Sequence, residues 1–224
     1  HKKRCYFDKW KVGRNMNTII TIGRQFGSGG HVIGEKLAQH YGIKYFDKEL
    51  LSRAAQESGF CEEMLKNHDE RPTNSFLYNL VMDTYTFGYN SSSFVDMPIS
   101  HKVFMAQFDT IKKIADEGAC VIVGRCADYA LEEFDNVVSV FVHAPLEKRI
   151  ARVGEYEKID TAAAKKMVLQ NDKKRASYYN YYTNKKWGDG ATYDLCVNTG
   201  KVGIYGAAEI IKNYVIMKET KLNL

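Results

Sequence analysis

The sequence has no long apolar run, and this absence excludes one large class of protein. None of the apolar stretches in its 224 residues approaches the roughly 18 residues that a membrane-spanning helix needs. The first residues also lack the apolar core of a secretory signal. With 45% apolar residues, the chain can still bury a full core. We therefore expect a globular, cytoplasmic protein without a membrane partner.

Cysteine is scarce and is not spaced for shared chemistry. The five cysteines are odd in number, and no two of them stand in C-x-x-C spacing. They are Cys5, Cys61, Cys120, Cys126 and Cys196. Such a set predicts neither a disulfide framework nor a cysteine metal site, so we interpret these residues as reduced thiols and expect no metal site built from protein side chains.

An excess of charge of one sign is also missing. The net charge is only +5, and Lys and Arg are interleaved with acidic residues except at His1–Arg4. We expect a small anionic ligand rather than nucleic acid. Residues 1–15 are basic and have no clear period, so we interpret them as an N-terminal extension, followed by a single domain over residues 16–224.

Strand and helix patterns alternate along the rest of the chain. Strands are predicted at residues 18–23, 43–46, 119–123, 137–142 and 193–197. Helices are predicted at residues 31–41, 48–58, 98–117 and 204–217, with a helical insert at 61–100 and a lid region at 145–192. This alternation predicts an α/β fold: a five-stranded parallel sheet between helical layers, with ligands bound beyond the carboxyl ends of the strands.

Glycines crowd the segment after the first predicted strand. Gly27, Gly29, Gly30 and Gly34 fall within eight residues. Glycine permits positive φ, so successive N–H groups of such a loop can converge on one anion at a helix N-terminus. The loop departs from the pattern G-x-x-x-x-G-K-[ST], because Gly30 and His31 stand where the lysine and the hydroxyl belong. We predict a variant phosphate loop, although His31 is also an ordinary residue for a first helical turn.

Polar residues follow the next two predicted strands. Asp47 comes after the second strand and Arg125 after the third. Because parallel strands end at one edge of a sheet, these side chains should share a crevice with the glycine loop. Two plainer interpretations stay open: Asp47 as the cap of the following helix, and Arg125 as an ordinary salt-bridge residue.

Arginines gather in the predicted lid region. Arg149 and Arg152 lie three residues apart on one helix, and Arg175 follows on another, close to Asp172. Guanidinium forks suit phosphoryl oxygens that gain charge during transfer, but a solvated helix face would show the same pattern. We expect the tyrosine cluster at 178–182 to pack beneath this region rather than to stack on bases.

Four segments, in chain order, carry a family resemblance. They are Ile20–His31, Tyr45–Leu51, Cys120–Arg125 and Tyr193–Thr199. Together they resemble the cytidylate kinase-like family, a branch of the P-loop nucleoside monophosphate kinases. The resemblance implies a three-layer P-loop NTPase-type fold whose helical insert binds the acceptor. It also implies an ATP-dependent phosphotransferase that uses Mg²⁺ and phosphorylates a nucleoside monophosphate, most plausibly CMP or dCMP.

The resemblance further implies roles for individual residues. On the donor side it implies Gly27, Ser28, Gly29, Gly30 and His31 around the ATP phosphates, with Asn198 and Thr199 beside the base. On the acceptor side it implies Asp47, Lys48, Arg125, Asp128 and Asp172. The catalytic arginines that it implies are Arg149, Arg152 and Arg175, to which we add Arg24 because the loop departs from the family pattern. We nominate Arg24 as the substitute for the missing lysine, whose loss should cost on the order of 3 kcal/mol of transition-state stabilisation.

Two other functions fit parts of the sequence. Loss of the loop lysine is also expected of a nucleotide-binding regulator with weak catalysis. The spacing from Gly27-x-Gly29 to Asp47 resembles the dinucleotide fingerprint of oxidoreductases, although Val32 stands where its third glycine belongs. Assembly as a homodimer is a further open expectation.

Overall fold

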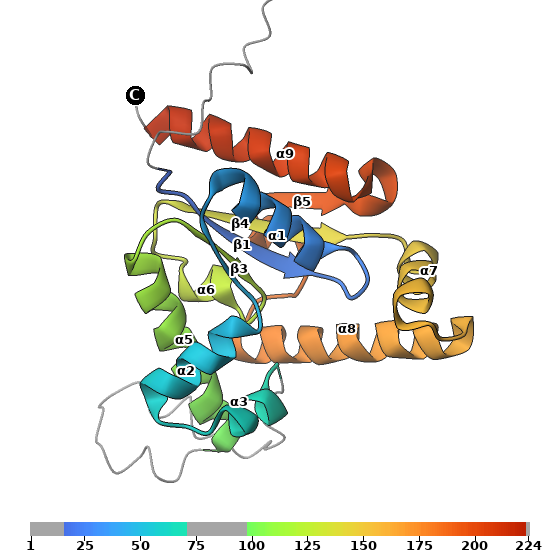
Figure 1. Ribbon diagram of the computed structural model, residues 1–224, viewed down its shortest axis with the longest axis horizontal. Helices are drawn as coiled ribbons and strands as arrows, with labels where there is room; N and C mark the ends of the chain where they lie inside the picture. Colours follow the sequence, from blue (N-terminus) through green and yellow to red (C-terminus); the bar gives the residue numbers. More distant parts are fainter. Residues whose placement is uncertain (1–15, 71–97, 223–224) are drawn as a thin grey trace, which may run out of the picture.

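A five-stranded parallel sheet forms the centre of the molecule (Figure 1). The computed structural model describes residues 16–70 and 98–222. The strands are β1 (Ile19–Arg24), β2 (Lys44–Phe46), β3 (Cys120–Val123), β4 (Val137–His143) and β5 (Leu195–Asn198). Each lies within two residues of its predicted range at both ends, so the strand predictions are confirmed.

The strand order is β2-β3-β1-β4-β5. β1 lies between β3 and β4, with Ile20 opposite Val121 on one side and Val138 on the other. The common dinucleotide-binding order, 3-2-1-4-5-6, instead places the first strand beside the second. The sheet therefore removes the structural support for the oxidoreductase alternative.

Each face of the sheet is covered by helices, because the side chains of β1 alternate between two cores. Ile20 and Ile22 pack against α1 (Gly30–Tyr41) and α9 (Thr199–Leu222). Ile19 faces the other layer, which contains α2 (Glu49–Ser58), α5 (Ile99–Asp116) and α6 (Ala127–Ala130). The predicted three-layer α/β/α architecture is confirmed. No described helix is both long and apolar enough to cross a membrane.

The helix predictions agree with the structure apart from the two ends of α9, which runs to Leu222 rather than to 217, and one missed α-helix. α9 begins at Thr199 rather than at 204, with a break at Gly203, whose φ of 73° interrupts the helix. The four-residue α6 was not predicted. Of the predicted insert at 61–100, α3 (Glu62–His68) is described, whereas residues 71–97 and the predicted extension at 1–15 lie outside the described residues.

A helical hairpin lies at the carboxyl ends of the strands (Figure 1). It consists of α7 (Leu146–Glu157) and α8 (Thr161–Thr183), which is followed by the short 3-10 helix η2 (Gly190–Thr192). Ile150 and Val153 of α7 pack on Ala164 and Val168 of α8. Farther along α8, the tyrosines at 178 and 179 are buried beside the aromatic side chains of α5 and β4, so the packing predicted for them is confirmed. The hairpin thus carries its arginines to the edge where β1 opens into the glycine loop.

Candidate active site

The glycine loop joins β1 to α1. Gly27 and Gly29 have φ of 76° and 92°, the left-handed region that favours glycine. Gly29 is the N-cap of α1 and makes no side-chain cap, so it leaves the first N–H groups of the helix available to an anion. Ser28 Oγ donates to Gln25 O at 2.8 Å and closes the turn. The loop therefore has the geometry of a phosphate-binding turn.

Two arginines of α7 bind the carbonyl groups of this loop. Arg149 is 5% exposed, and its Nη1 donates to Phe26 O at 3.1 Å and to Asp172 Oδ2 at 2.6 Å. Arg152 Nη1 donates to Ser28 O at 3.1 Å. These guanidinium groups brace the loop from its carbonyl side. The interpretation of this arginine pair as a solvated helix face is wrong.

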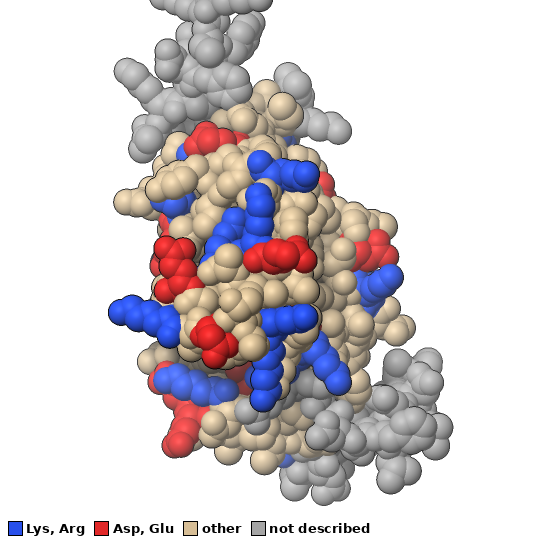
Figure 2. Space-filling model, turned by 90° about the vertical axis from the view of Figure 1, so that its right-hand side faces the viewer, with Lys and Arg blue, Asp and Glu red and all other residues tan. Residues whose placement is uncertain are grey.

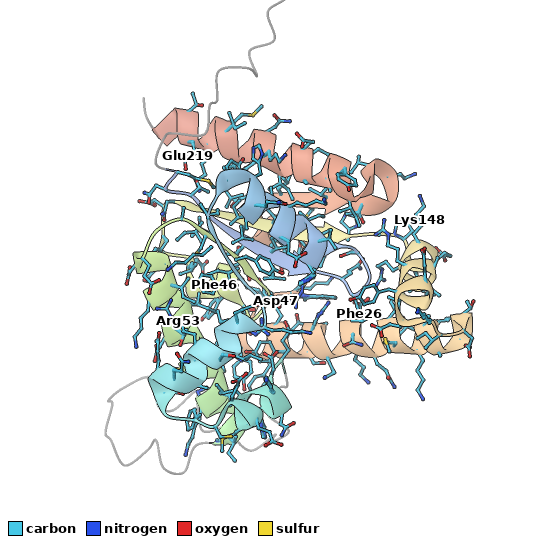
Figure 3. The ribbon with its side chains drawn as sticks, viewed as in Figure 1. Phe26, Phe46, Asp47, Arg53, Lys148 and Glu219 are labelled. Carbon is cyan, nitrogen blue, oxygen red and sulfur yellow. The ribbon has the colours of Figure 1, made fainter. Side chains whose placement is uncertain are left out.

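Residues from two other elements complete the brace around the loop, whose Phe26 is labelled in Figure 3. Asp172 Oδ1, on α8, accepts the backbone N–H of Phe26 at 2.8 Å. Thr199, 1% exposed at the start of α9, donates from Oγ1 to Ser28 O at 2.7 Å. Its neighbour Asn198 accepts the N–H of residue 200 at 2.9 Å. The shape of the loop thus depends on residues that are distant in the sequence.

Asp47 and Arg125 meet at the adjacent part of the same edge, as the strand-end argument predicted. Arg125 Nη1 donates to Asp47 Oδ1 at 3.2 Å, and its Nε and Nη2 donate to Asp69 Oδ1 and Oδ2 at 3.0 and 2.9 Å. The side chain of Arg125 is 3% exposed. Helix α2 begins without a side-chain cap, because its N-cap residue is Lys48, which is exposed. The capping interpretation of Asp47 is therefore wrong.

One carboxylate bridges two further arginines. Glu70 Oε1 accepts from Arg24 Nη1 at 2.9 Å, and Oε2 accepts from Arg175 Nε at 3.3 Å. Arg24 Nη2 also lies 4.0 Å from Asp47 Oδ1. Arg24 ends β1 and Arg175 belongs to α8, so the bridge joins the sheet to the hairpin. It marks a place where two cations from different elements hold one anion.

Burial and charge set the pKa values of this cluster. Burial alone would raise the pKa of Glu70, but Arg24 and Arg175 hold it well below its usual range. Burial also opposes ionisation of Asp47, yet Arg24 and Arg125 lower its pKa overall. Burial, reinforced by Arg24, lowers the pKa of Arg175 to about 10. All three groups therefore carry their charges at neutral pH.

A small cavity lies among these side chains. Its volume is about 20 Å³, and its lining includes Arg24, Glu70, Arg125, Asp128 and Arg175. That space suffices for about one water molecule and not for a phosphoryl group. Burial raises the pKa of the Asp128 carboxyl, which accepts the hydroxyl of the tyrosine at 179 at 2.6 Å. An anionic ligand can enter only if side chains here move aside.

A larger hollow lies elsewhere. A cavity of about 610 Å³ opens at the amino ends of β2 and β3, beside Ile43, Glu117 and Cys120. None of the predicted site residues lines it. Parallel α/β sheets bind their ligands at the carboxyl ends of the strands. We therefore take the smaller cavity, which lies at that edge among the arginines, as the candidate site.

His31 links the first turn of α1 to Asp47. Its Nδ1 lies 3.0 Å from Asp47 Oδ2 and 2.7 Å from the hydroxyl of Tyr45, and its Nε2 lies 3.3 Å from Glu35 Oε1. A Mg²⁺ ligand at this loop position would be a hydroxyl oxygen, and an imidazole is a poor substitute for it. Within residues 16–70 and 98–222, no three His, Cys, Asp or Glu residues are grouped to hold a metal ion.

Sequence reasoning missed the two acids that pair with the arginines. Asp69 and Glu70 follow α3 in the insert, and no motif distinguishes them from its other acids. Their adjacency just after a helix was the one available signal. The four cysteines of the described part of the chain are free thiols, and Cys5 lies outside it.

The surface beside the hairpin has mixed charge. On the face that carries α7, Figure 2 shows Lys and Arg side chains interspersed with Asp and Glu. The arginines of the site are mostly buried instead, with side chains 12% exposed for Arg24 and 16% for Arg175. The guanidinium groups of the site are thus held inside the protein, where carboxylates pair with them.

Comparison with known proteins gives concordant matches. The model of the cytidylate kinase-like family matches residues 19–201. The cytidylate kinase of Methanopyrus kandleri is 25% identical over 84% of this chain and 87% of its own length, and that of Pyrococcus horikoshii is 26% identical over 87% and 86%.

Two solved structures are similar to this chain in fold. An uncharacterized protein from Eubacterium ventriosum is 32% identical, with a TM-score of 0.67 over 88% of this chain and 98% of its own. Shikimate kinase from Bacteroides thetaiotaomicron has a TM-score of 0.51 at 11% identity, over 88% and 98% of the two chains. The second likeness shows the fold alone.

Proposed function

This chain belongs to the cytidylate kinase-like family, and from that premise we propose that it transfers the γ-phosphoryl group of ATP to CMP or dCMP. Membership makes it a nucleoside monophosphate kinase, and hence a transferase. One observation carries the proposal: Arg24, Arg125 and Arg175 converge beside the phosphate loop. Three cations at one point suit two phosphorylated groups that must meet.

The reaction needs little covalent chemistry from the protein. An oxygen of the acceptor phosphate attacks the γ-phosphorus, the bond from that phosphorus to the bridging oxygen breaks, and ADP leaves. The attacking oxygen is already anionic, so no general base is required. Catalysis then depends on holding both phosphates in line and on stabilising the charge of the transferring group. Guanidinium groups in a largely buried site suit the second task.

We place the donor phosphates on the glycine loop. The N–H groups of Gly27 and of Gly29 to His31 would hold the β-phosphate, while the Ser28 N–H donates to Gln25 O at 3.2 Å. The brace of Arg149, Arg152 and Thr199 would keep these groups aligned. Because His31 replaces the hydroxyl, we propose that Mg²⁺ is carried mainly by the phosphates of ATP, as is usual for this ion. The ion would neutralise part of the charge that the arginines face.

We place the acceptor on the other side of the cluster. Arg125 and Asp47 lie where the phosphate of a nucleoside monophosphate would approach the loop. Asp128 also lines the cavity, and its carboxyl group could form hydrogen bonds with polar atoms of the base. Lys48 at the rim is exposed and would help to attract the anion.

A coupled assay of ADP formation tests this proposal. The purified chain is incubated with ATP, Mg²⁺ and one of CMP, dCMP, UMP or AMP. We expect kcat/KM to be highest for CMP or dCMP. ADP formation that does not depend on any acceptor contradicts the proposal.

The missing lysine at Gly30 favours one other candidate, a nucleotide-binding regulator. A thermal-unfolding panel separates the two. ATP at 100 times its dissociation constant stabilises a protein by about 2.7 kcal/mol whether or not turnover occurs. Such stabilisation with no ADP formation from any acceptor would support the regulator.

A further inference from the structure

The loop departs from the usual phosphate loop at two positions, and the two changes are complementary. In G-x-x-x-x-G-K-[ST] the first position is glycine and the seventh is lysine. Here the first is Arg24 and the seventh is Gly30. The cation and the glycine have exchanged places across the loop.

The structure shows why the two positions depend on each other. A Cβ atom placed on Gly30 would lie 2.7 Å from Cβ of Arg24 and 3.0 Å from its Cγ. Carbon atoms in good contact are about 3.5–4.0 Å apart. The stem of Arg24 therefore occupies the volume that a side chain at position 30 would need, and one cation excludes the other.

A second glycine clears the rest of the path. A Cβ atom on Gly124, which follows β3, would overlap Nη1 of Arg24. The side chain of Arg24 thus runs from the loop across two glycines into the interior. Only backbone lines its course at these two points.

The guanidinium group of Arg24 ends between the two halves of the site. It donates to Glu70, which also binds Arg175, and it lies 4.0 Å from Asp47 on the acceptor side. A lysine at position 30 would start from the first turn of α1, whereas Arg24 starts from the end of β1 and reaches the same crevice.

We propose that Arg24 and Gly30 form one functional unit, in which Arg24 is the catalytic cation of the loop and Gly30 is the positioning residue that gives it room. This inference rests on the proposed kinase function. During transfer, the guanidinium group of Arg24 leaves Glu70 and donates to oxygens of the γ-phosphoryl group. In this role Gly30 acts through the conformation of Arg24, by having no side chain, and not through its backbone N–H, which we place on the β-phosphate.

The substitution Gly30→Ala tests the positioning role through the sign of its effect on stability. Alanine in a helix normally stabilises relative to glycine, and φ at position 30 is not in the left-handed region. If Arg24 occupies the space, Gly30→Ala should instead lower both Tm and kcat. We expect kcat to fall about 100-fold or more, as for loss of one transition-state donor. Gly206→Ala in α9, where the new Cβ would meet only Val202, at 3.2 Å, is the control and should leave kcat unchanged.

A double-substitution cycle assigns the effect to Arg24. In an Arg24→Gly background, which removes the Cβ atom that meets position 30, Gly30→Ala should raise Tm and cause no further loss of kcat. The pair Arg24→Gly with Gly30→Lys should recover at least tenfold in kcat over Arg24→Gly with Gly30→Ala. Failure of that recovery would show that Arg24 does not stand in for the lysine.

Other outcomes also decide the question. Gly30→Ala with higher Tm and wild-type kcat overturns the proposal. If Gly30→Ala alone does not fold, folding of the double variant with Arg24→Gly supports it, and failure of that double variant to fold contradicts it. If the wild-type chain forms no ADP with any acceptor, the proposed function and the catalytic role of Arg24 fail together. The Tm values would then still decide separately whether residues 24 and 30 compete for one volume.

Discussion

Oδ1 of Asp172 accepts the backbone N–H of Phe26 at 2.8 Å, which ties the middle of α8 to the phosphate loop. The other oxygen of the same carboxylate pairs with Arg149 at 2.6 Å. Loop, α7 and α8 are therefore connected through a single side chain. A substitution in the hairpin should therefore alter the conformation of the loop that we assign to the donor phosphates.

The first prediction concerns this connection. Asp172→Ala should lower the free energy of unfolding by about 2–4 kcal/mol, because it leaves Arg149 buried without its carboxylate and Phe26 N–H without an acceptor. KM for ATP should rise as the loop loosens. Urea unfolding and ADP-formation kinetics measure the two effects. Asp109→Ala, an exposed position on α5, is the control and should change stability by less than about 0.5 kcal/mol.

The second prediction concerns Glu70, whose carboxylate accepts hydrogen bonds from two arginines, Arg24 and Arg175. Glu70→Gln removes a competing anion, so KM for the acceptor should fall about three- to tenfold, which corresponds to roughly 0.7–1.4 kcal/mol. Steady-state kinetics with varied CMP measure it. Glu63→Gln, an exposed acid on α3, makes the same change of charge and should leave KM as it is. A higher KM in Glu70→Gln would mean that the carboxylate orients the arginines for the acceptor instead.

The third prediction concerns the hydroxyl of Thr199. Thr199→Val keeps the shape but leaves Ser28 O and Arg152 without that partner, at a cost of about 1–3 kcal/mol in unfolding free energy. We expect a higher KM for ATP with a smaller change in kcat. Thr220→Val on the exposed side of α9 is the control. Equal unfolding midpoints for the two variants would show that the loop does not need this hydroxyl.

The fourth prediction concerns acid. Unfolded Asp and Glu bind protons near pH 4, whereas the pKa values of folded Asp47 and Glu70 are lower. Protons then bind the unfolded chain more strongly. The stabilisation of the folded state by these two carboxylates is complete above about pH 5, and it is lost as the pH falls through and below 4. Urea unfolding from pH 7 to pH 3 should show a shallower decline for the pair Asp47→Asn with Glu70→Gln than for the wild type, with Glu63→Gln as the control. Parallel declines would contradict it.

The sheet and most helices could be predicted because short-range patterns specify them. Ile19, Ile20 and Ile22 alternate between the two faces of β1, and the glycines mark the turn that follows. The meeting of Asp47 with Arg125 could also be predicted, since parallel strands end at one edge. These inferences need only the period of the side chains and the direction of the strands.

The partners of the arginines could not be predicted in the same way. Arg149 and Arg152 occupy adjacent positions on one face of a helix in either interpretation, and only the position of the loop carbonyls decides what they bind. Asp69 and Glu70 lie in an insert without a distinctive motif. Such contacts depend on segments that are far apart in the chain.

The sequence by itself determined the layers of this protein, the edge of the sheet that carries the candidate site and the loop that lacks a lysine, because hydrophobic period and glycine placement act over a few residues. Only the tertiary structure decided that Arg24 fills the space beside Gly30 and that Glu70 holds it there. The reason is steric and electrostatic. Side chains compete for volume and form ion pairs only with neighbours in space, and only the folded chain brings those neighbours together.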